Sequence, residues 1–356
     1  MQHDRDTDAS FDATTAGGPD ATTAVDRGAY ANAVTPWEQP TWRADALGWI
    51  ERELAARGLR ESGPRTVRLR PWSVLVRTHA AGLGTVWFKA NPPASAFEAA
   101  LTSALARWVP GHALRPIAVD VDRGWSLLPD GGPLFKTALG AGAVDPRAWE
   151  EPLRQYAHVQ RTLTPHADEI ERLGVPAART RALPDLVDRL VTDGTALTAD
   201  DRRRLRALRP RLVEWCAELA AVGIADTLDH ADLHEGQLFH PGPGRYTFFD
   251  WGDATVSHPF CSFRVPARRM VPDHHGAGRA ALLRLRDAYL EPWTGDGAGP
   301  VELRRALSLS WRLGAVGRAA SWGRLFPGTS RTTDDVCAAQ SAASLLELLD
   351  APPALG

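Results

Sequence analysis

The pattern of hydrophobic and polar positions changes along the chain, from short strand-like runs in the first third to longer helical repeats after it. Residues 40–59 repeat their apolar side chains with a helical period, and Gly58 marks the predicted end of that helix. Three short runs with strand character follow, and a glycine-containing turn at residues 79–84 separates the last two. The three runs span residues 66–70, 72–77 and 86–89. The pattern therefore predicts a helix followed by a small antiparallel sheet.

A second helix and two further strands complete this first part of the chain. Residues 94–108 carry apolar side chains at helical spacing, with Ser95 as the expected cap and Glu98 three residues later, as in a capping box. Residues 113–121 and 125–128 read as strands. The composition then breaks at a Pro/Gly-rich stretch, Pro129-Asp130-Gly131-Gly132-Pro133, where we place a lobe boundary.

The rest of the chain is predicted to be mostly helical, with one β-hairpin inside it. The predicted helices span residues 146–163, 183–192, 199–222, 278–290, 301–322 and 333–349. The hairpin is expected where two short apolar runs flank the Pro/Gly turn at residues 241–244. Strands first and helices second predict an α+β fold with two lobes. We expect a small N-lobe with an antiparallel sheet at residues 35–130 and a larger helical C-lobe at residues 131–352.

Composition adds limits on the class of protein. The chain has 356 residues and a net charge of −2, so no strong field favours a nucleic-acid or membrane partner. Residues 1–34 are rich in Asp, Thr, Ala and Gly and are expected to form a disordered tail. Three widely spaced cysteines match no zinc spacing and no disulfide framework, which favours a reducing cytoplasm.

The predicted hairpin brings two carboxylates together. Asp232 comes before its first strand and Asp250 directly after its second. Such a pair suits phosphoryl transfer, in which one carboxylate orients the attacking hydroxyl and the other holds Mg²⁺ on the nucleotide phosphates. Each aspartate taken singly is as well explained as a turn residue. It is the spacing of the two across the hairpin that indicates phosphoryl-transfer chemistry.

The residues around the hairpin resemble the catalytic and metal-binding loops of the aminoglycoside phosphotransferase family. The matching residues are His230, Asp232 and His234 in the first motif and Asp250, Trp251 and Ala254 in the second. The resemblance implies a protein-kinase-like fold. It implies Asp232 as the catalytic residue, Asp250 as the principal Mg²⁺ ligand, and transfer from ATP or GTP to a hydroxyl of a small molecule. Asp253 is expected to be a structural or supporting carboxylate, and His230 to pack beneath the loop and bond to backbone groups.

The same resemblance gives a role to a lysine in the predicted sheet. Lysine is rare in this chain, since Lys89 and Lys136 are the only ones. Lys89 ends a predicted strand, and the family pattern implies that it contacts the α- and β-phosphates while an ion pair with Glu98 holds it. The alternative is a surface lysine and a helix-capping glutamate. Ser73, in the first turn of the sheet, is a further candidate for a phosphate contact, because no Gly-x-Gly-x-x-Gly loop is present.

The chain departs from the family motif at one position. Gln237 stands where the family has a metal-binding Asn. Both amides offer a carbonyl oxygen, but Gln is one methylene longer, and Mg²⁺ demands near-ideal octahedral geometry. The alternatives are therefore an active small-molecule kinase, a degenerate kinase fold that binds nucleotide without catalysis, and an α+β protein with a fortuitous match. Acids and arginines are nearly balanced after Val271, which favours an acceptor with a neutral or apolar body. Sugars, amino alcohols, macrolides and other natural products all stay open as acceptor classes.

Overall fold

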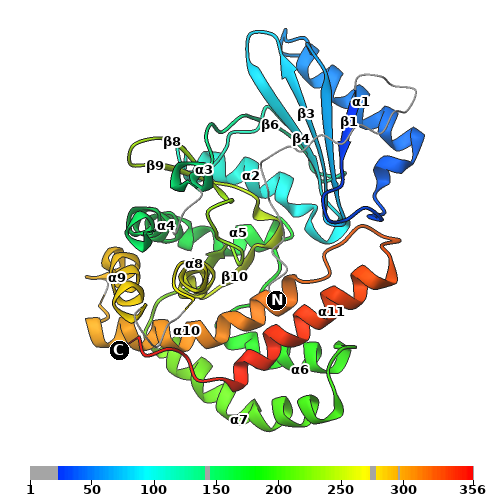
Figure 1. Ribbon diagram of the computed structural model, residues 1–356. Coiled ribbons are helices and arrows are strands. Elements are labelled where there is room, and N and C mark those ends of the chain that lie inside the picture. Colours follow the sequence, from blue (N-terminus) through cyan, green and yellow to red (C-terminus); the bar gives the residue numbers. More distant parts are fainter. Residues whose placement is uncertain (1–22, 141–144, 273–277, 296, 356) are drawn as a thin grey trace.

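The computed structural model describes residues 23–140, 145–272, 278–295 and 297–355, which form a small N-terminal sheet and a larger helical part (Figure 1). The predicted α+β class is confirmed. The sheet has the strand order β1-β2-β3-β4-β6-β5, and only β1 runs parallel to its neighbour. Its strands are β1 (Thr23–Asp26), β2 (Arg65–Arg70), β3 (Ser73–Ala80), β4 (Gly84–Ala90), β5 (Ala118–Asp120) and β6 (Trp125–Pro129).

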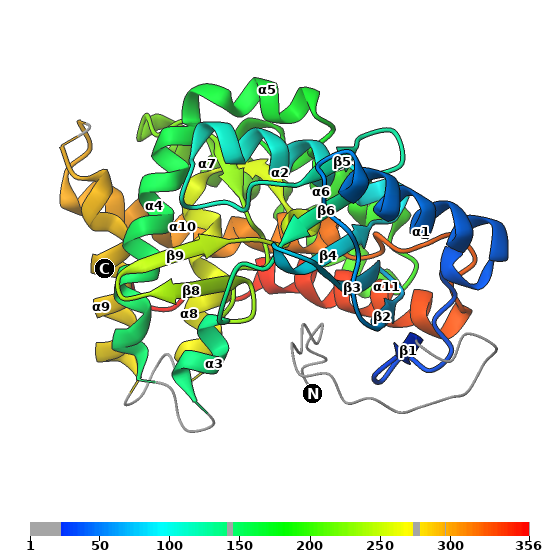
Figure 2. The same ribbon diagram turned by 90° about the horizontal axis from the view of Figure 1, so that it is seen from above.

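Alternation along these strands gives the sheet two different faces. Val67, Val76 and Phe88 point to one face and are fully buried against helix α1 (Pro40–Ala55), through Trp49 and Ile50. Figure 2 shows α1 lying along this side of the sheet. Along each of these strands, the residues that alternate with the buried ones point to the opposite face of the sheet. That face is turned toward the candidate site.

The helical part carries most of the hydrophobic core. Its α-helices are α3 (Phe135–Leu139), α4 (Glu150–Leu163), α5 (Ala167–Arg172), α6 (Leu183–Asp193), α7 (Ala199–Ala221), α8 (Arg264–Met270), α9 (Arg279–Leu290), α10 (Pro300–Ser321) and α11 (Arg331–Leu346). Short 3₁₀ helices lie at Pro36–Glu38, Pro93–Ser95, Pro146–Trp149, Thr164–His166, Thr180–Ala182, Trp251–Asp253, Pro259–Phe263, Glu291–Trp293 and Glu347–Leu349. Within the described ranges, no helix combines the length and the apolar composition that crossing a membrane requires.

Helix α2 (Phe97–Trp108) connects the two parts. It follows the sheet strands in sequence, but Phe97, Leu101 and Leu105 belong to the hydrophobic cluster of the helical part. A lobe boundary near residue 130 stays a prediction; the core contacts of α2 cross it.

Two small antiparallel ladders hold the loops of the candidate site. The predicted hairpin is present as β8 (Leu238–Gly242) and β9 (Arg245–Phe248). A second ladder, which the sequence did not reveal, pairs β7 (Thr227–Asp229) with β10 (Thr255–Ser257). Its strands have only three residues each, too few for a periodic signal. Together the ladders fix both ends of the segment from residue 229 to residue 255.

The expected disordered tail is wrong for residues 23–34. Residues 23–26 form β1, and Arg27 donates hydrogen bonds to the Ala33 carbonyl and to Glu38. A long-range contact explains the ordered strand, because the Asp26 carboxylate meets arginines of β2. Residues 1–22 of the predicted tail lie outside the described residues.

The connection between α10 and α11 reaches back to the sheet, just below its lower edge in Figure 1. The backbone N–H of Phe326 donates to the carbonyl of Pro71, in the turn between β2 and β3, at 2.8 Å. The Phe326 ring is buried in the cluster formed by the sheet and α1. Arg324 donates to the Gly252 carbonyl at 2.8 Å. We call residues 323–330 the strap, because they tie the sheet to the loop that carries Asp250.

Candidate active site

Lys89 bridges two carboxylates that come from different parts of the chain. Its Nζ lies 2.7 Å from Oε2 of Glu98, on the first turn of α2, and 2.5 Å from Oδ1 of Asp250, after β9. Lys89 and Glu98 are both buried. The expected ion pair between strand lysine and helix glutamate is therefore present, and the lysine also contacts the predicted metal-binding aspartate.

These three groups set one another's ionisation. Burial by itself would lower the pKa of Lys89, but the charges of Asp250 and Glu98 outweigh it and raise that pKa well above its ordinary value. Burial also raises the pKa of Glu98. Burial acts to raise the pKa of Asp250 too, but the Lys89 charge prevails and lowers it. Lys89 thus stays positive and Asp250 negative at neutral pH, as phosphate and metal contacts require.

Glu98 also fixes the turn that carries Asp250. Its Oε1 accepts the backbone N–H of Trp251 at 3.0 Å, and its Oε2 accepts Asn91 Nδ2 at 2.6 Å. Asp250 has left-handed backbone angles, φ 63° and ψ 63°, so these bonds hold a conformation that few residues adopt freely. The predicted capping box at Ser95 and Glu98 is wrong, and Ala96 is the N-cap of α2. The Glu98 carboxylate instead accepts hydrogen bonds from Lys89, Asn91 and the Trp251 backbone.

A buried network anchors the loop before β8. The Asp229 carboxylate accepts the Ala231 N–H at 2.9 Å and the Ser262 hydroxyl at 2.5 Å. Ala231 has a positive φ of 59°. His230 lies beneath the loop, where its Nε2 is 2.9 Å from the Phe249 carbonyl, so its expected packing role is confirmed. The network fixes the backbone of the residue that precedes Asp232.

Asp232 has a cationic partner that the sequence did not predict. Its Oδ1 lies 2.9 Å from Nη1 of Arg318, on α10, and the same nitrogen lies 3.5 Å from Asp253 Oδ2. His234 Nε2 is 3.8 Å from the other Asp232 oxygen, and His234 Nδ1 accepts the Gly236 N–H at 3.0 Å. Burial lowers the pKa of His234, so this imidazole is neutral at neutral pH.

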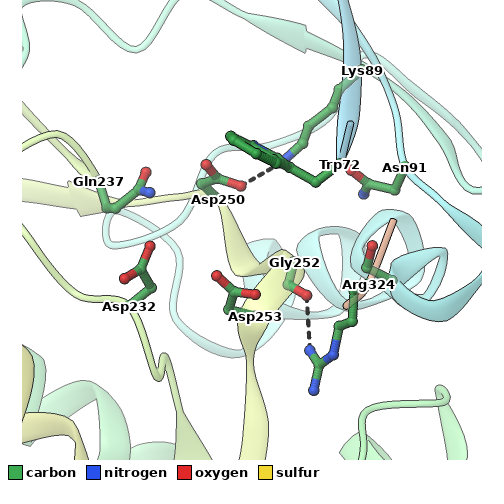
Figure 3. A pocket seen from close by; sticks show the side chains of 10 residues that line it. Trp72, Lys89, Asn91, Asp232, Gln237, Asp250, Gly252, Asp253 and Arg324 are labelled. Atoms are coloured by element: carbon green, nitrogen blue, oxygen red, sulfur yellow. Dashed lines mark hydrogen bonds and ion pairs between the residues drawn. The ribbon is translucent and has the colours of Figure 1, made fainter. Parts of the chain in front are cut away.

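Three carboxylates and two basic residues line one small pocket. Figure 3 shows Asp232, Asp250 and Asp253 gathered around it, with Lys89 reaching toward Asp250 from the strand, and Trp72 also lines the pocket. The structure therefore brings the predicted catalytic, metal-binding and phosphate-binding residues into one place. No group of three or more His, Cys, Asp or Glu side chains in the described ranges has the arrangement of a metal site formed by those residue types alone.

Gln237 lines the same pocket and has the chemistry of a hard-metal ligand. Its side chain is almost fully buried, and its Oε1 makes no hydrogen bond within the described part of the chain. A buried carbonyl oxygen without a donor is costly unless a ligand satisfies it. Carboxylate and amide oxygens are the ligands that Mg²⁺ prefers. Asp250 and Gln237 therefore fit a Mg²⁺ site.

A larger cavity of about 470 Å³ adjoins the pocket, and Lys89 and Asp250 line both. Ser73, the candidate phosphate contact, lies on its wall at the start of β3. The remaining lining residues include both aromatic and arginine side chains: Arg68, Arg70, Trp72, Arg77, Trp87, Phe239 and Phe249. The arginine side chains on this wall were not predicted.

The sequence did not predict several other residues of the site. Asn91 lies two residues after Lys89, which is the period of a strand. This spacing could have predicted that the two side chains share a face. Arg318 and Arg324 carry none, because arginine is the usual basic residue of this chain and both lie far from the motifs in sequence. Their roles depend on how α10 and the strap pack.

No protein-family model and no curated protein sequence matches this chain. Solved structures do match, with low identity over most of the chain. A putative aminoglycoside phosphotransferase from Ralstonia eutropha is 16% identical over 86% of this chain and 96% of its own, with a TM-score of 0.53. An ethanolamine kinase from Plasmodium vivax is 12% identical over 81% of both chains, with a TM-score of 0.52.

The chain has the fold of the small-molecule kinases. A GDP complex of an aminoglycoside 2′-phosphotransferase mutant is also similar, at 14% identity over 85% of this chain and 96% of its own, with a TM-score of 0.50. The kinase-like fold implied by the sequence motifs is confirmed.

Proposed function

We propose that this protein is a small-molecule kinase, which transfers the terminal phosphoryl group of ATP or GTP to a hydroxyl group of a small acceptor. The observation that carries the proposal is the contact of Lys89 with both Glu98 and Asp250 beside Asp232. Lys89 and Asp250 are 161 positions apart, so a chance motif match gives no reason for them to meet.

Asp232 orients the acceptor hydroxyl and takes its proton as the oxygen attacks the terminal phosphorus. Phosphoryl transfer depends on positioning more than on strong base catalysis, so a correctly placed carboxylate is sufficient. Arg318 holds one carboxylate oxygen and keeps Asp232 from rotating away. The other oxygen, near His234, is the one that faces the acceptor in this proposal.

Lys89 binds the α- and β-phosphates, and Glu98 holds the lysine in position. Asp250 is the principal ligand of Mg²⁺, and Gln237 supplies its buried amide oxygen as a second. A Mg²⁺ ion held by these two residues would supply positive charge to neutralise the phosphate oxygens. In this proposal the hydroxyl of Ser73, which lines the larger cavity, donates to a phosphate.

A second candidate is a kinase fold that binds nucleotide without transferring its phosphoryl group. Gln237 in place of the family's Asn is the observation that favours it. The two proposals differ in the effect of Gln237→Asn. A weakened metal site gains turnover from this change, whereas a non-catalytic fold gains none.

The acceptor is best sought by screening. We expect ATP or GTP with Mg²⁺ to raise the melting temperature, since a ligand that binds only the folded state stabilises it by mass action. A library of sugars, amino alcohols, macrolides and other hydroxyl compounds added to that complex should give a further rise for the true acceptor. Phosphorus NMR then identifies the phosphomonoester formed. No nucleotide-dependent rise and no phosphomonoester across the library would contradict the proposal.

A further inference from the structure

The turn between β2 and β3 offers a bound phosphate few backbone donors. In kinase folds a glycine-rich loop at this place covers the phosphates. Here the turn consists of Pro71 and Trp72, because Arg70 and Ser73 already pair across the two strands. Proline has no N–H, so Trp72 supplies the one backbone donor of this loop. The Pro71 carbonyl accepts the strap's Phe326 N–H, which holds the turn in place.

Two buried arginines stand on the cavity face of the same strand. Arg68 and Arg70 line the larger cavity, with relative exposures of only 6% and 5%. Through the ladder, Arg68 pairs with Leu75, which pairs with Lys89. Arg68 and Lys89 therefore share a face of the sheet at two strand spacings, about 10 Å apart in the backbone.

The carboxylate of Asp26 holds both guanidinium groups in position. Its Oδ2 lies 3.2 Å from Arg68 Nε and 3.2 Å from Arg70 Nη2. The Nε of Arg70 is buried and makes no hydrogen bond within the described residues. A guanidinium presents its donors in a planar fork that matches phosphate oxygens, and its Nε leaves Arg70 a donor suited to an oxyanion.

We infer that Arg68 and Arg70 bind the phosphate chain of the nucleoside triphosphate, in the role that backbone N–H groups of a glycine-rich loop have in other kinase folds. This inference rests on the proposed kinase function and goes beyond it, because it assigns donor binding to side-chain charge. Arg70 lies next to Ser73 and the turn, and Arg68 shares its row of the sheet with Lys89. Strand β1 then acts as a brace that sets the two guanidinium groups through Asp26.

The test separates binding of the phosphates from binding of the nucleoside. Calorimetry with Mg²⁺ gives the dissociation constants of ATP or GTP and of the matching nucleoside for each variant. We expect Arg70→Gln and Arg68→Gln each to weaken triphosphate binding by about tenfold or more, since a charge-assisted hydrogen bond is lost. Nucleoside binding should stay within about twofold, because neither side chain contacts the base in this assignment.

Arg65→Gln is the matched control. Arg65 begins the same strand, but its partners are Glu51 and Glu61, outside the cavity. It should leave both dissociation constants unchanged. An equal effect of the Arg68 and Arg70 substitutions on triphosphate and nucleoside, or no effect on either, would overturn the inference and leave the kinase proposal standing. A wild-type protein that binds no nucleoside triphosphate would instead refute the proposed function.

Asp26→Asn keeps the inference testable if the arginine variants do not fold. The substitution removes the competing carboxylate charge and keeps an amide of the same shape. We expect it to tighten triphosphate binding severalfold and to leave nucleoside binding unchanged. Triphosphate binding that is unchanged or weaker in Asp26→Asn would overturn the inference.

Discussion

Gln237 places a buried amide oxygen without a hydrogen-bond partner in the described residues beside three carboxylates. Such an oxygen destabilises the metal-free protein, by about 1–3 kcal/mol for an unsatisfied buried polar group. The same oxygen gains a strong interaction when a hard cation is bound. At this position, stability and metal binding therefore oppose each other.

Gln237→Leu separates these two effects. We expect the metal-free variant to unfold at the same temperature as wild type or higher, because the unsatisfied oxygen is removed at similar volume. The Mg²⁺ concentration for half-maximal nucleotide binding should rise about tenfold or more, as when groups supporting a metal site are lost. Thermal unfolding and Mg²⁺ titrations of nucleotide binding measure both quantities. A destabilised variant with unchanged Mg²⁺ dependence would indicate a purely structural role for Gln237.

At the scale of elements, the strap connects the sheet to the Asp250 turn. Arg324 donates to the Gly252 carbonyl at 2.8 Å and to the Ala254 carbonyl at 3.2 Å, and its guanidinium lies over the Phe97 ring. One side chain thereby joins the turn that carries Asp250 to α2, the helix that carries Glu98. The strap itself is absent from the sequence predictions, since it has no periodic pattern.

Arg324→Gln should loosen this connection. The buried Ala254 carbonyl and the part-buried Gly252 carbonyl lose their donor, which costs about 1–3 kcal/mol of folding stability. We also expect lower turnover with little change in nucleoside binding, because the Asp250 turn loses support and the cavity wall does not. Urea unfolding and turnover assays measure these effects. Arg331→Gln, at an exposed position on α11, is the control and should leave folding stability and turnover unchanged. An Arg324 variant as stable and active as that control would show that Arg324 does not support the Asp250 turn.

The sequence predicted the elements with strong periodicity and missed those that depend on long-range contacts. The helix at residues 40–59, the sheet strands and the hairpin agree with α1, β2–β4 and β8–β9. Strand β1 was missed because two arginines of β2 order it, and the β7–β10 ladder because its strands are very short. For the candidate site, motif spacing indicated Asp232 and Asp250, and the scarcity of lysine with its place at a strand end indicated Lys89; the structure brings these three residues together. It could not find Arg318, whose contact with Asp232 depends on the packing of α10.

For the molecule as a whole, a buried histidine predicts sensitivity to acid. His258 is fully buried at the start of the 3₁₀ helix Pro259–Phe263, and its Nδ1 accepts the Phe260 N–H. Burial lowers the pKa of His258 to about 3, whereas the unfolded chain binds that proton near pH 6.5. Between these values the unfolded state holds more protons, so this group's contribution to folding stability falls as the pH falls.

His258→Asn should reduce that sensitivity. An Asn at this position still accepts the Phe260 N–H but does not titrate. The wild-type free energy of unfolding should fall by up to about 1.4 kcal/mol per pH unit from this group below pH 6.5, and the variant should lack that share. Urea unfolding at pH 7.5, 6 and 5 gives the slopes. Equal slopes for wild type and variant would show that His258 does not carry the dependence.

In the proposed function, Asp232 and Asp250 form one phosphoryl-transfer site with Lys89. The most direct measurement is Mg²⁺-dependent hydrolysis of ATP or GTP by the purified protein, compared with Asp232→Asn and Asp250→Asn. The surface substitution Asp200→Asn, on α7, is the control. We predict that the control keeps the wild-type rate and that each site variant loses about 10²-fold or more, as removal of an acid–base or metal-binding group does. Hydrolysis at the wild-type rate in both site variants would show that Asp232 and Asp250 do not form a phosphoryl-transfer site.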